Sequence, residues 1–227
     1  MEKVVAFVPI KYHSQRLHGK NFLDFMGRPL CTYIFETLTQ ISGVDERYVY
    51  CSNPDIKKYL PDGVRFKKRD EWLDGDEVKG LDIIEAFVAD VDADVYIITH
   101  ATQPFTKASS IDHGLRKVLE DGYDSAFSCV EHQDYFWYQG KPLNYDMKDI
   151  VTTQQVDPLY METGAFFIFR KEVFTKLHQR IGANPYRCLV DRFEAIDIDT
   201  EEDFVFAEAA GDYLRKMEDS HEKGRYS

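Results

Sequence analysis

Long apolar runs are missing from this sequence of 227 residues. No stretch reaches the roughly 18 consecutive apolar residues that a membrane-spanning helix needs. The chain opens Met-Glu-Lys-Val-Val-Ala-Phe-Val-Pro, without the basic start and small-residue cleavage site of a secretory signal peptide. We therefore expect no association with a membrane and place the protein in the cytoplasm.

Cysteine is scarce, and the four residues of this type are widely scattered: Cys31, Cys51, Cys129 and Cys188. No two of them have the CxxC spacing of a zinc site or a redox pair, so neither is indicated. We expect buried, reduced thiols, which is how free cysteines in globular proteins usually occur.

Basic charge is also in short supply, because 28 Lys and Arg residues face 40 Asp and Glu residues, for a formal net charge of −12. Non-specific binding to nucleic acid depends on neutralising phosphates with Lys and Arg, so this balance argues against a nucleic-acid partner. A small nucleotide is still allowed, since a few local cations are enough to hold a triphosphate.

The hydrophobic fraction of 44% is enough for one sizeable core, and we expect a single domain over residues 1–227. Apolar runs alternate with segments of helical periodicity, which is typical of a three-layer α/β sandwich with a mostly parallel, Rossmann-like sheet. The predicted strands are 4–9, 47–51, 64–67, 94–99, 125–130, 162–170 and 195–199, and the predicted helices are 29–41, 54–59, 80–91, 109–121 and 201–216.

Residues 131–160 interrupt this alternation and show no clear period. A stretch of this length inside a compact domain is usually functional. Its aromatic group, Tyr135, Phe136, Trp137 and Tyr138, favours a packing or subunit interface over a ligand box, since aromatic residues are enriched at interfaces.

The segment after the first predicted strand concentrates positive charge in Lys11, Arg16 and Lys20, with Ser14 and Gly19 between them. In a doubly wound sheet, ligands bind at the carboxyl ends of the strands. Cations and small residues are what a triphosphate requires there, although the Walker motif GxxxxGK[ST] is absent. A solvated basic loop is the alternative interpretation.

Asp197 and Asp199 form an acidic pair near the end of the sequence. On the predicted strand 195–199, carboxylates at positions i and i+2 face the same side. A divalent cation shared with phosphate oxygens would neutralise them. Thr200 and Asp203 can also cap the helix that follows, and this capping role is compatible with metal binding.

Both segments resemble motifs of the CMP-sugar synthetases, which activate acylneuraminic acids and ketodeoxyoctonate. Residues 8–21, V-P-I-K-Y-H-S-Q-R-L-H-G-K-N, resemble that family's I-P-A-R-x-x-S-K-R-L-P-G-K-N, and residues 196–203, I-D-I-D-T-E-E-D, resemble its I-D-I-D-T-E-x-D. The resemblance implies nucleotide binding by Lys11, Ser14, Arg16, Lys20 and Asn21, a Mg²⁺ site at Asp197 and Asp199, and catalytic roles for Arg16, Lys20 and Asp199.

The middle of the chain matches the same family more loosely. Residues 69–80 stand in place of a base-binding segment, which implies nucleotide contacts from Arg69, Lys79 and Gly80. Residues 100–105, H-A-T-Q-P-F, and 160–165, Y-M-E-T-G-A, stand where the family has L-Q-P-T-S-P-L-R and F/Y-R-x-N-G-A. The acceptor-binding residues carried over are His100, Thr102, Gln103, Tyr160 and Glu162, although His100 has a purely structural role as its alternative.

Together these features predict an enzyme that transfers CMP from CTP to a small acidic acceptor of the sugar-acid type. The resembled family uses the excursion to build a dimer, so we expect a homodimer. A phosphate or phosphonate acceptor is the first alternative. A catalytically inactive homologue that serves as a binding subunit in glycan assembly is the second.

Overall fold

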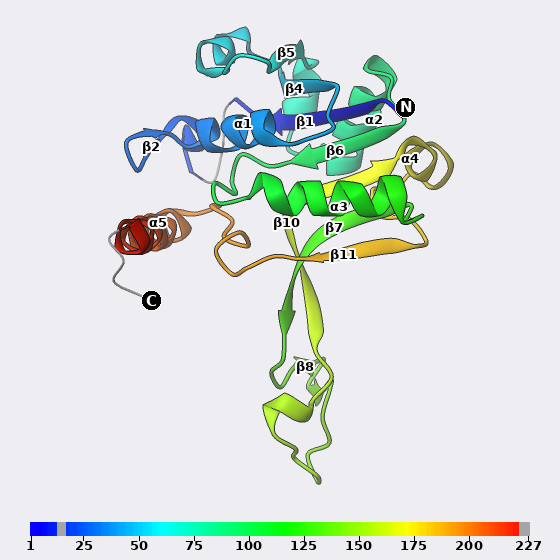
Figure 1. Cartoon of the computed structure of the whole chain (residues 1–227), viewed down its shortest axis with the longest axis vertical. Helices are drawn as coiled ribbons and strands as arrows, with labels where there is room; N and C mark the ends of the chain where they lie inside the picture. Colours follow the sequence, from blue (N-terminus) through cyan, green and yellow to red (C-terminus); the bar gives the residue numbers. More distant parts are fainter. Residues whose placement is uncertain (13–16, 223–227) are drawn as a thin grey trace.

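The computed structural model describes residues 1–12 and 17–222, and its centre is a seven-stranded sheet (Figure 1). The strand order is β11-β7-β10-β6-β1-β4-β5. The strands are β1 (Val4–Ile10), β4 (Glu46–Cys51), β5 (Arg65–Lys68), β6 (Val95–Thr99), β7 (Ser125–His132), β10 (Leu159–Arg170) and β11 (Pro185–Leu189). All pairings are parallel except those of β10, which runs antiparallel to β6 and β7. The predicted mostly parallel sheet is confirmed.

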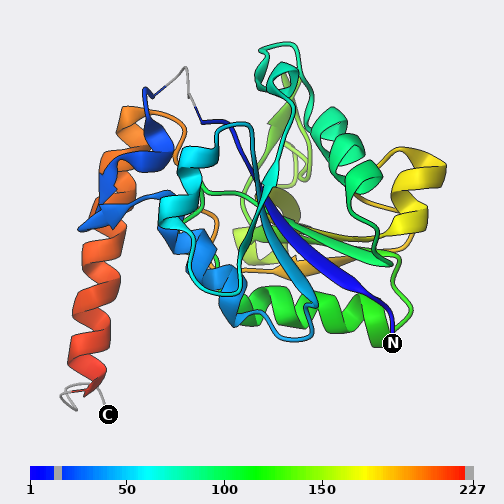
Figure 2. The same ribbon diagram turned by 90° about the horizontal axis from the view of Figure 1, so that it is seen from above.

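Helices cover both faces of the sheet (Figures 1 and 2). Along β1, Val4, Ala6 and Val8 pack with α1 (Cys31–Gln40) and α3 (Ala108–Glu120) in one core cluster. Val5 and Phe7 point the other way, into a second cluster with α2 (Gly80–Asp90) and α4 (Lys171–Leu177). A strand whose successive side chains enter two cores must be apolar throughout, which is why β1 reads as a continuous apolar run.

A third, smaller apolar cluster lies beside the main body and holds α5 (Glu201–Glu222) in place. It joins Ala207 of this helix to Phe25 and Leu30, around the hairpin of β2 (Asp24–Phe25) and β3 (Arg28–Pro29), and to Ile198. Short 3₁₀ segments complete the chain: η1 (Lys20–Phe22), η2 (Pro54–Tyr59), η3 (Glu71–Asp74) and η4 (Thr153–Gln155).

The segment at 131–160 projects away from the sheet on the extended ends of β7 and β10 (Figure 1). Within it lies a small hairpin of β8 (Trp137–Tyr138) and β9 (Lys141–Pro142). We call residues 131–160 the excursion. Its place as an interruption between two strands of the sheet matches the sequence-based expectation.

Three local expectations differ from the structure. Residues 195–199 are not a strand, because β11 occupies the sheet edge beside β7 and the backbone N–H of Ile198 donates instead to the Thr102 carbonyl, at 2.9 Å. The helix α4 and the strand β11 were not predicted. Both are short, so neither shows enough of a hydrophobic period to be recognised in the sequence.

All four cysteines are free and buried, as expected. Burial raises the pKa of Cys31 and of Cys188 to about 12, so these thiols stay protonated and unreactive near neutral pH. No helix within residues 1–12 and 17–222 combines the length and apolar character needed to cross a membrane.

Candidate nucleotide-binding and active site

Lys20 and Asp199 bring the two ends of the chain together. The Lys20 Nζ donates a hydrogen bond to Asp199 Oδ1 at 2.9 Å. Lys20 lies in η1, directly after Gly19, whose φ of 65° suits glycine and turns the chain inward. Lys20 is 6% exposed and Asp199 is partly exposed, so the pair lies at the rim of the protein interior.

Asp197 lies next to this pair, on the irregular segment between β11 and α5. Buried Ile198 separates the two aspartates, so both carboxylates keep access to the surface although no strand forms. Partial burial raises the pKa of Asp197, the Thr102 hydroxyl lowers it, and the negative charge of Asp199 raises it again. The two carboxylates therefore repel each other within one site.

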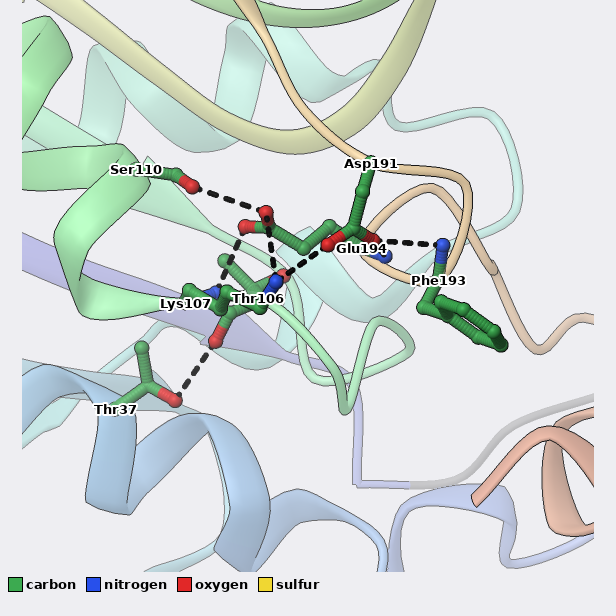
Figure 3. Close-up of polar contacts among 7 residues, drawn as sticks. All are labelled: Thr37, Thr106, Lys107, Ser110, Asp191, Phe193 and Glu194. Atoms are coloured by element: carbon green, nitrogen blue, oxygen red, sulfur yellow. Dashed lines mark hydrogen bonds and ion pairs between the residues drawn. The ribbon is translucent and has the colours of Figure 1, made fainter. Parts of the chain in front are cut away.

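A buried carboxylate, Glu194, anchors the segment that carries both aspartates (Figure 3). It accepts hydrogen bonds from the Lys107 backbone N–H at 3.0 Å and from the Ser110 hydroxyl at 3.0 Å. Lys107 and Ser110 belong to the start of α3. Glu194 therefore connects the segment with Asp197 and Asp199 to a helix that covers one face of the sheet. The Lys107 ammonium also pairs with Asp191.

The helix cap predicted at Thr200 is confirmed. The Thr200 backbone N–H donates to Asp203 Oδ2 at 2.8 Å, and the Asp203 N–H donates to the Thr200 hydroxyl at 3.2 Å. The Asp199 N–H also donates to Asp203, at 3.1 Å. This reciprocal cap fixes the backbone at the point where the aspartates emerge.

The donor set suits a hard cation that also binds substrate oxygens. The charge of Asp199 raises the pKa of Asp197, and both carboxylates offer oxygen ligands. Mg²⁺ is typically held by one or two carboxylates plus phosphates and water. No cluster of three or more His, Cys, Asp or Glu residues occurs in the described part of the chain, so a metal cage supplied by the protein alone is not present there. Asp197 and Asp199 are the residues that could hold such a cation.

A cavity of about 380 Å³ lies at the carboxyl ends of β1 and β6, within the usual size range of ligand sites. Its apolar walls come from η3, α2 and the strands, and its polar groups converge on one space. It is lined by Pro9, Lys11, Arg69, Leu73, Gly75, Asp76, Val78, Gly80, Ile83, Ile84, Ile98, His100 and Arg180. Three of the predicted nucleotide-binding residues, Lys11, Arg69 and Gly80, therefore lie in one cavity.

Arg69 is 1% exposed and is held against this cavity by an ion pair with Asp74, which also accepts from the Ser52 hydroxyl. The Nε of Arg69 is buried and has no hydrogen-bond partner among residues 1–12 and 17–222. Buried donors are nearly always paired, so an unpaired one on a cavity wall is suited to a ligand.

Asn21 and Lys11 are joined by a hydrogen bond near the cavity. The Asn21 amide donates to the Lys11 carbonyl at 3.0 Å, and the Lys11 Nζ pairs with Asp76 at 2.9 Å. Lys79 is exposed and lies in an adjoining cavity, immediately before Gly80. The remaining two predicted nucleotide contacts, Ser14 and Arg16, fall outside the described residues.

His100 closes the cavity at the end of β6. Its Nδ1 lies 2.6 Å from the Gly164 carbonyl, an acceptor only, so this nitrogen donates and the neutral ring keeps its Nε2 lone pair. Burial lowers the pKa of His100, and the hydrogen bond to Gly164 raises it. The hydrogen bond found here is the structural contact of the alternative interpretation, and it leaves the second ring nitrogen for a ligand.

The carbonyl that His100 uses belongs to an irregularity in β10, where the register with β7 shifts between Glu162 and Phe167. Gly164 has a φ of 78°, which a residue with a side chain rarely adopts. The neighbouring Thr163 carbonyl accepts from the amide of Gln103, which is 1% exposed. Gln103 therefore helps to hold the irregular part of β10 in place through this hydrogen bond. Its predicted contact with an acceptor stays a prediction.

Glu162 lies at the edge of a second cavity, of about 510 Å³, which shares Gly80 and Arg180 with the first. Its carboxylate is 3.7 Å from an Nη atom of Arg180. Arg180 follows α4 in a stretch that no motif marks, so sequence reasoning missed it. Only the unpredicted elements α4 and β11 place it beside the site.

Two predicted acceptor residues lie elsewhere. Tyr160 donates to Glu131 at 3.0 Å and stacks with Arg187, on the neighbouring strands β7 and β11. No interaction joins it to His100 or Glu162 among the described residues. Thr102 bonds the segment of Asp197, as described above, and so lies between the acceptor and metal candidates.

The central sheet, with its helices on both faces and a cationic cavity at its carboxyl edge, defines a Rossmann-like α/β fold. A structure of CMP:2-keto-3-deoxy-manno-octonic acid synthetase complexed with CTP has the same fold, with a TM-score of 0.69 at 17% identity over 93% of this chain and 99% of that one. A 4-diphosphocytidyl-2C-methyl-D-erythritol synthase from Anaerococcus prevotii gives 0.68 at 12% identity, over 94% and 96%.

The Cytidylyltransferase family profile matches residues 5–220, and the chain belongs to that family. A 3-deoxy-manno-octulosonate cytidylyltransferase from Escherichia coli is 27% identical over 121 residues, 53% of this chain and 48% of the relative. An N-acylneuraminate cytidylyltransferase from Streptococcus agalactiae is 23% identical over 216 residues, 89% and 52%. The chain spans about half the length of the curated relatives it matches. The resemblance to CMP-sugar cytidylyltransferases is confirmed.

Proposed function

We propose that this protein transfers CMP from CTP to a small acidic acceptor of the sugar-acid type, releasing pyrophosphate. The observation that carries the proposal is the Lys20–Asp199 pair, which joins the cationic first loop to the acidic segment. Asp197 of that segment is near enough to His100, on the wall of the 380 Å³ cavity, to affect the pKa of the imidazole. The family match and the relatives that act on ulosonic and neuraminic acids support it.

The cavity between β1 and α2 is proposed to take the cytidine. Leu73, Ile84 and Ile98 offer apolar contact to a base, while Gly80, with nothing within 4 Å of an added Cβ, leaves room for it. The triphosphate would then extend from Lys11 toward Lys20. Lys11 and Lys20 would neutralise the charge of the departing pyrophosphate.

The chemistry we propose is an in-line displacement. An oxygen of the acceptor attacks the α-phosphorus, a new P–O bond forms, and the bond to pyrophosphate breaks. His100 Nε2 is suited to accept the proton that the attacking hydroxyl loses. Asp197 and Asp199 would hold Mg²⁺ with the nucleotide, and the ion would neutralise charge on the phosphates. The residues of the protein supply position and charge, which account for most of the rate in such transfers.

The acceptor proposal is broader than either relative's substrate. The match is weakest where the acceptor should bind, and His100, Met161 and Glu162 differ from the resembled motifs. We therefore expect poor use of N-acetylneuraminate. A phosphate or phosphonate acceptor is the competing enzyme function, and an inactive binding subunit is the competing function of another class. The retained Lys20 and Asp199 pair counts against the latter.

Release of pyrophosphate from CTP tests the proposal directly. The protein is assayed with magnesium, and again with excess EDTA, across ketodeoxyoctonate, N-acetylneuraminate, other sugar acids and small phosphonates. Magnesium-dependent release with a sugar acid is the expected result. Release with phosphonates alone would favour the competing enzyme function. Binding of CTP, without release of pyrophosphate in the presence of any acceptor, would favour the binding subunit.

A further inference from the structure

Arg180 lies where the two adjoining cavities of the site meet. It lines both the 380 Å³ cavity that holds Lys11 and Arg69 and the 510 Å³ cavity that holds Lys79 and Glu162. Because Gly80 is the one other lining residue common to both, the guanidinium marks the boundary between the nucleotide side and the remaining space.

The guanidinium of Arg180 is fixed but incompletely paired. Its Cζ lies 3.6 Å from the centre of the Phe167 ring, a stacking contact that orients the plane of the group. Within residues 1–12 and 17–222, Glu162 is the one carboxylate within ion-pair distance, and at 3.7 Å the contact is longer than a hydrogen bond. Five N–H donors in a fixed fork are therefore held toward the cavities with one loose anionic neighbour.

The surroundings of Arg180 favour the binding of an anion. Burial lowers the pKa of Arg180, which means that loss of water disfavours its charge. A desolvated cation of this kind gains most from a planar, doubly hydrogen-bonding anion, and a carboxylate fits the guanidinium fork. Glu162 occupies the position of such an anion without making the short contacts.

His100 places Arg180 relative to the reacting groups. The positive charge of Arg180 lowers the pKa of His100, while the negative charge of Asp197 raises it. The imidazole therefore feels both charges, and it lines the 380 Å³ cavity together with Arg180. An anion bound to Arg180 in that cavity would share the space with the imidazole.

We propose that Arg180 is the residue that selects an acidic acceptor, by exchanging its loose contact with Glu162 for a bidentate contact with the acceptor's carboxylate. This inference rests on the proposed function and names its substrate class. A neutral acceptor leaves the guanidinium half-paired and is rejected for that reason, as sites built around particular polar groups generally reject substrates that lack them.

The test compares Arg180→Gln and Arg180→Lys with Arg116→Gln, a matched control. Arg116 is an exposed arginine of α3 that lines neither of the two cavities. Each protein is assayed for the KM of sugar acids, including ketodeoxyoctonate and N-acetylneuraminate, for the KM of their carboxyl methyl esters, and for the KM of CTP. Thermal unfolding of each variant verifies folding.

The expected result for Arg180→Gln is a rise in acid KM of about ten- to hundredfold, with the KM of CTP unchanged and the preference for acid over ester lost. Arg180→Lys should retain part of that preference, and Arg116→Gln should behave like the wild type. Glu162→Gln should retain or improve acid binding, because it removes the competing carboxylate. A rise in the KM of CTP alone, the same loss in Arg116→Gln, or an equal loss in Glu162→Gln would overturn the inference.

Calorimetry separates this inference from the proposed function. Binding of the same acids is measured on the wild type and Arg180→Gln in the presence of a non-hydrolysable CTP analogue. If no acceptor supports pyrophosphate release but acid binding still depends on Arg180, the proposed function fails and the inference stands. If release occurs but binding of acids is the same in both proteins, the function stands and the inference fails.

Discussion

Lys20 Nζ donates to Asp199 Oδ1 at 2.9 Å across 179 residues of sequence, so the first loop and the segment before the last helix form one site. The motif with Lys20 and the motif with Asp199 lie at opposite ends of the sequence, and the ion pair brings them together in the fold. Lys20 is nearly buried, and its carboxylate partner at the rim offsets the cost of burying a cation.

Replacing Lys20 with alanine should weaken the use of CTP far more than the use of the acceptor. A charge-assisted contact with phosphate is worth about 1.5–3 kcal/mol, so kcat/KM for CTP should fall about ten- to hundredfold. Steady-state kinetics with each substrate varied in turn measures this. Lys117→Ala, which removes a surface ion pair with Asp121, is the control. A raised KM for the acceptor with normal CTP kinetics would show that the triphosphate lies elsewhere.

Replacing Asp199 with asparagine should lower turnover on the order of a hundredfold or more, since the change removes one of two carboxylates proposed to hold the metal–nucleotide complex. It also leaves Lys20 without its anion. The free energy of unfolding should fall by about 1–3 kcal/mol, less than for a fully buried pair because Asp199 keeps solvent contact. Urea denaturation and kinetics at saturating magnesium measure the two effects. Near-normal turnover there would remove Asp199 from the site.

The fold was predictable because its signals are local. The apolar run of β1 and the periods of the long helices appear directly in the sequence, and most predicted elements have counterparts in the structure. The segment 195–199 was predicted wrongly, since alternation of apolar and acidic residues is the same whether or not a strand partner is available. What decides is tertiary: β11 fills the edge beside β7, and Thr102 takes the Ile198 N–H.

The site was predictable only where motifs carry it. Lys20 and Asp199 stand in segments that resemble a family, so both could be named. Arg180 and Glu194 have no such marker, and their roles depend on which distant groups they meet: Phe167 and Glu162 for the first, the start of α3 for the second. Such contacts cannot be deduced from one sequence by composition or spacing.

Glu194 should make the stability of the protein depend on pH. Burial raises the pKa of this carboxyl, against the lowering effect of the Lys107 N–H and the Ser110 hydroxyl. The folded protein therefore keeps the proton at pH values where the unfolded chain has released it. The contribution of Glu194 to the free energy of unfolding falls as the pH rises from the usual carboxyl range through that raised pKa.

Glu194→Gln removes this ionisation, so the unfolding free energy of the wild type minus that of the variant should decrease between about pH 4 and the raised pKa. Urea denaturation of both proteins at stepped pH measures the difference. Asp191→Asn is a useful contrast: burial raises the pKa of Asp191, but its bonds from Lys107 and two backbone N–H groups outweigh this and lower it. Its difference should therefore increase with pH over the acid range. A flat profile for Glu194→Gln would contradict the assigned burial.

His100→Asn separates the structural role of His100 from a chemical one. The asparagine amide can replace Nδ1 as the donor to the Gly164 carbonyl but offers no counterpart to Nε2. If Nε2 accepts the acceptor's proton, kcat should fall by about 10²–10⁴-fold while the thermal stability stays close to that of the wild type. The wild-type kcat/KM should also decline on the acid side, at a pH below the ordinary histidine pKa, because burial lowers the pKa of His100. Wild-type kcat in the variant would leave only the structural role.

The excursion should hold two copies of this chain together. Its apolar side chains are unusually exposed for a single chain: Trp137 at 57%, Tyr138 at 63%, Met147 at 59% and Ile150 at 65%. Exposed apolar side chains gathered on one projecting segment favour an interface, and aromatic residues dominate the energetics of interfaces. The wild type should therefore sediment with twice the mass of one chain. Trp137→Glu combined with Tyr138→Glu should shift it to the monomer, because charges would be buried without partners on both sides of the contact.

Trp72→Glu is the matched control, since Trp72 is equally exposed, at 61%, but lies in η3 on the body of the protein. A wild type that remains monomeric at high micromolar concentration, or a dimer that Trp72→Glu disrupts while the excursion variant keeps it, would assign the exposed aromatic residues another role.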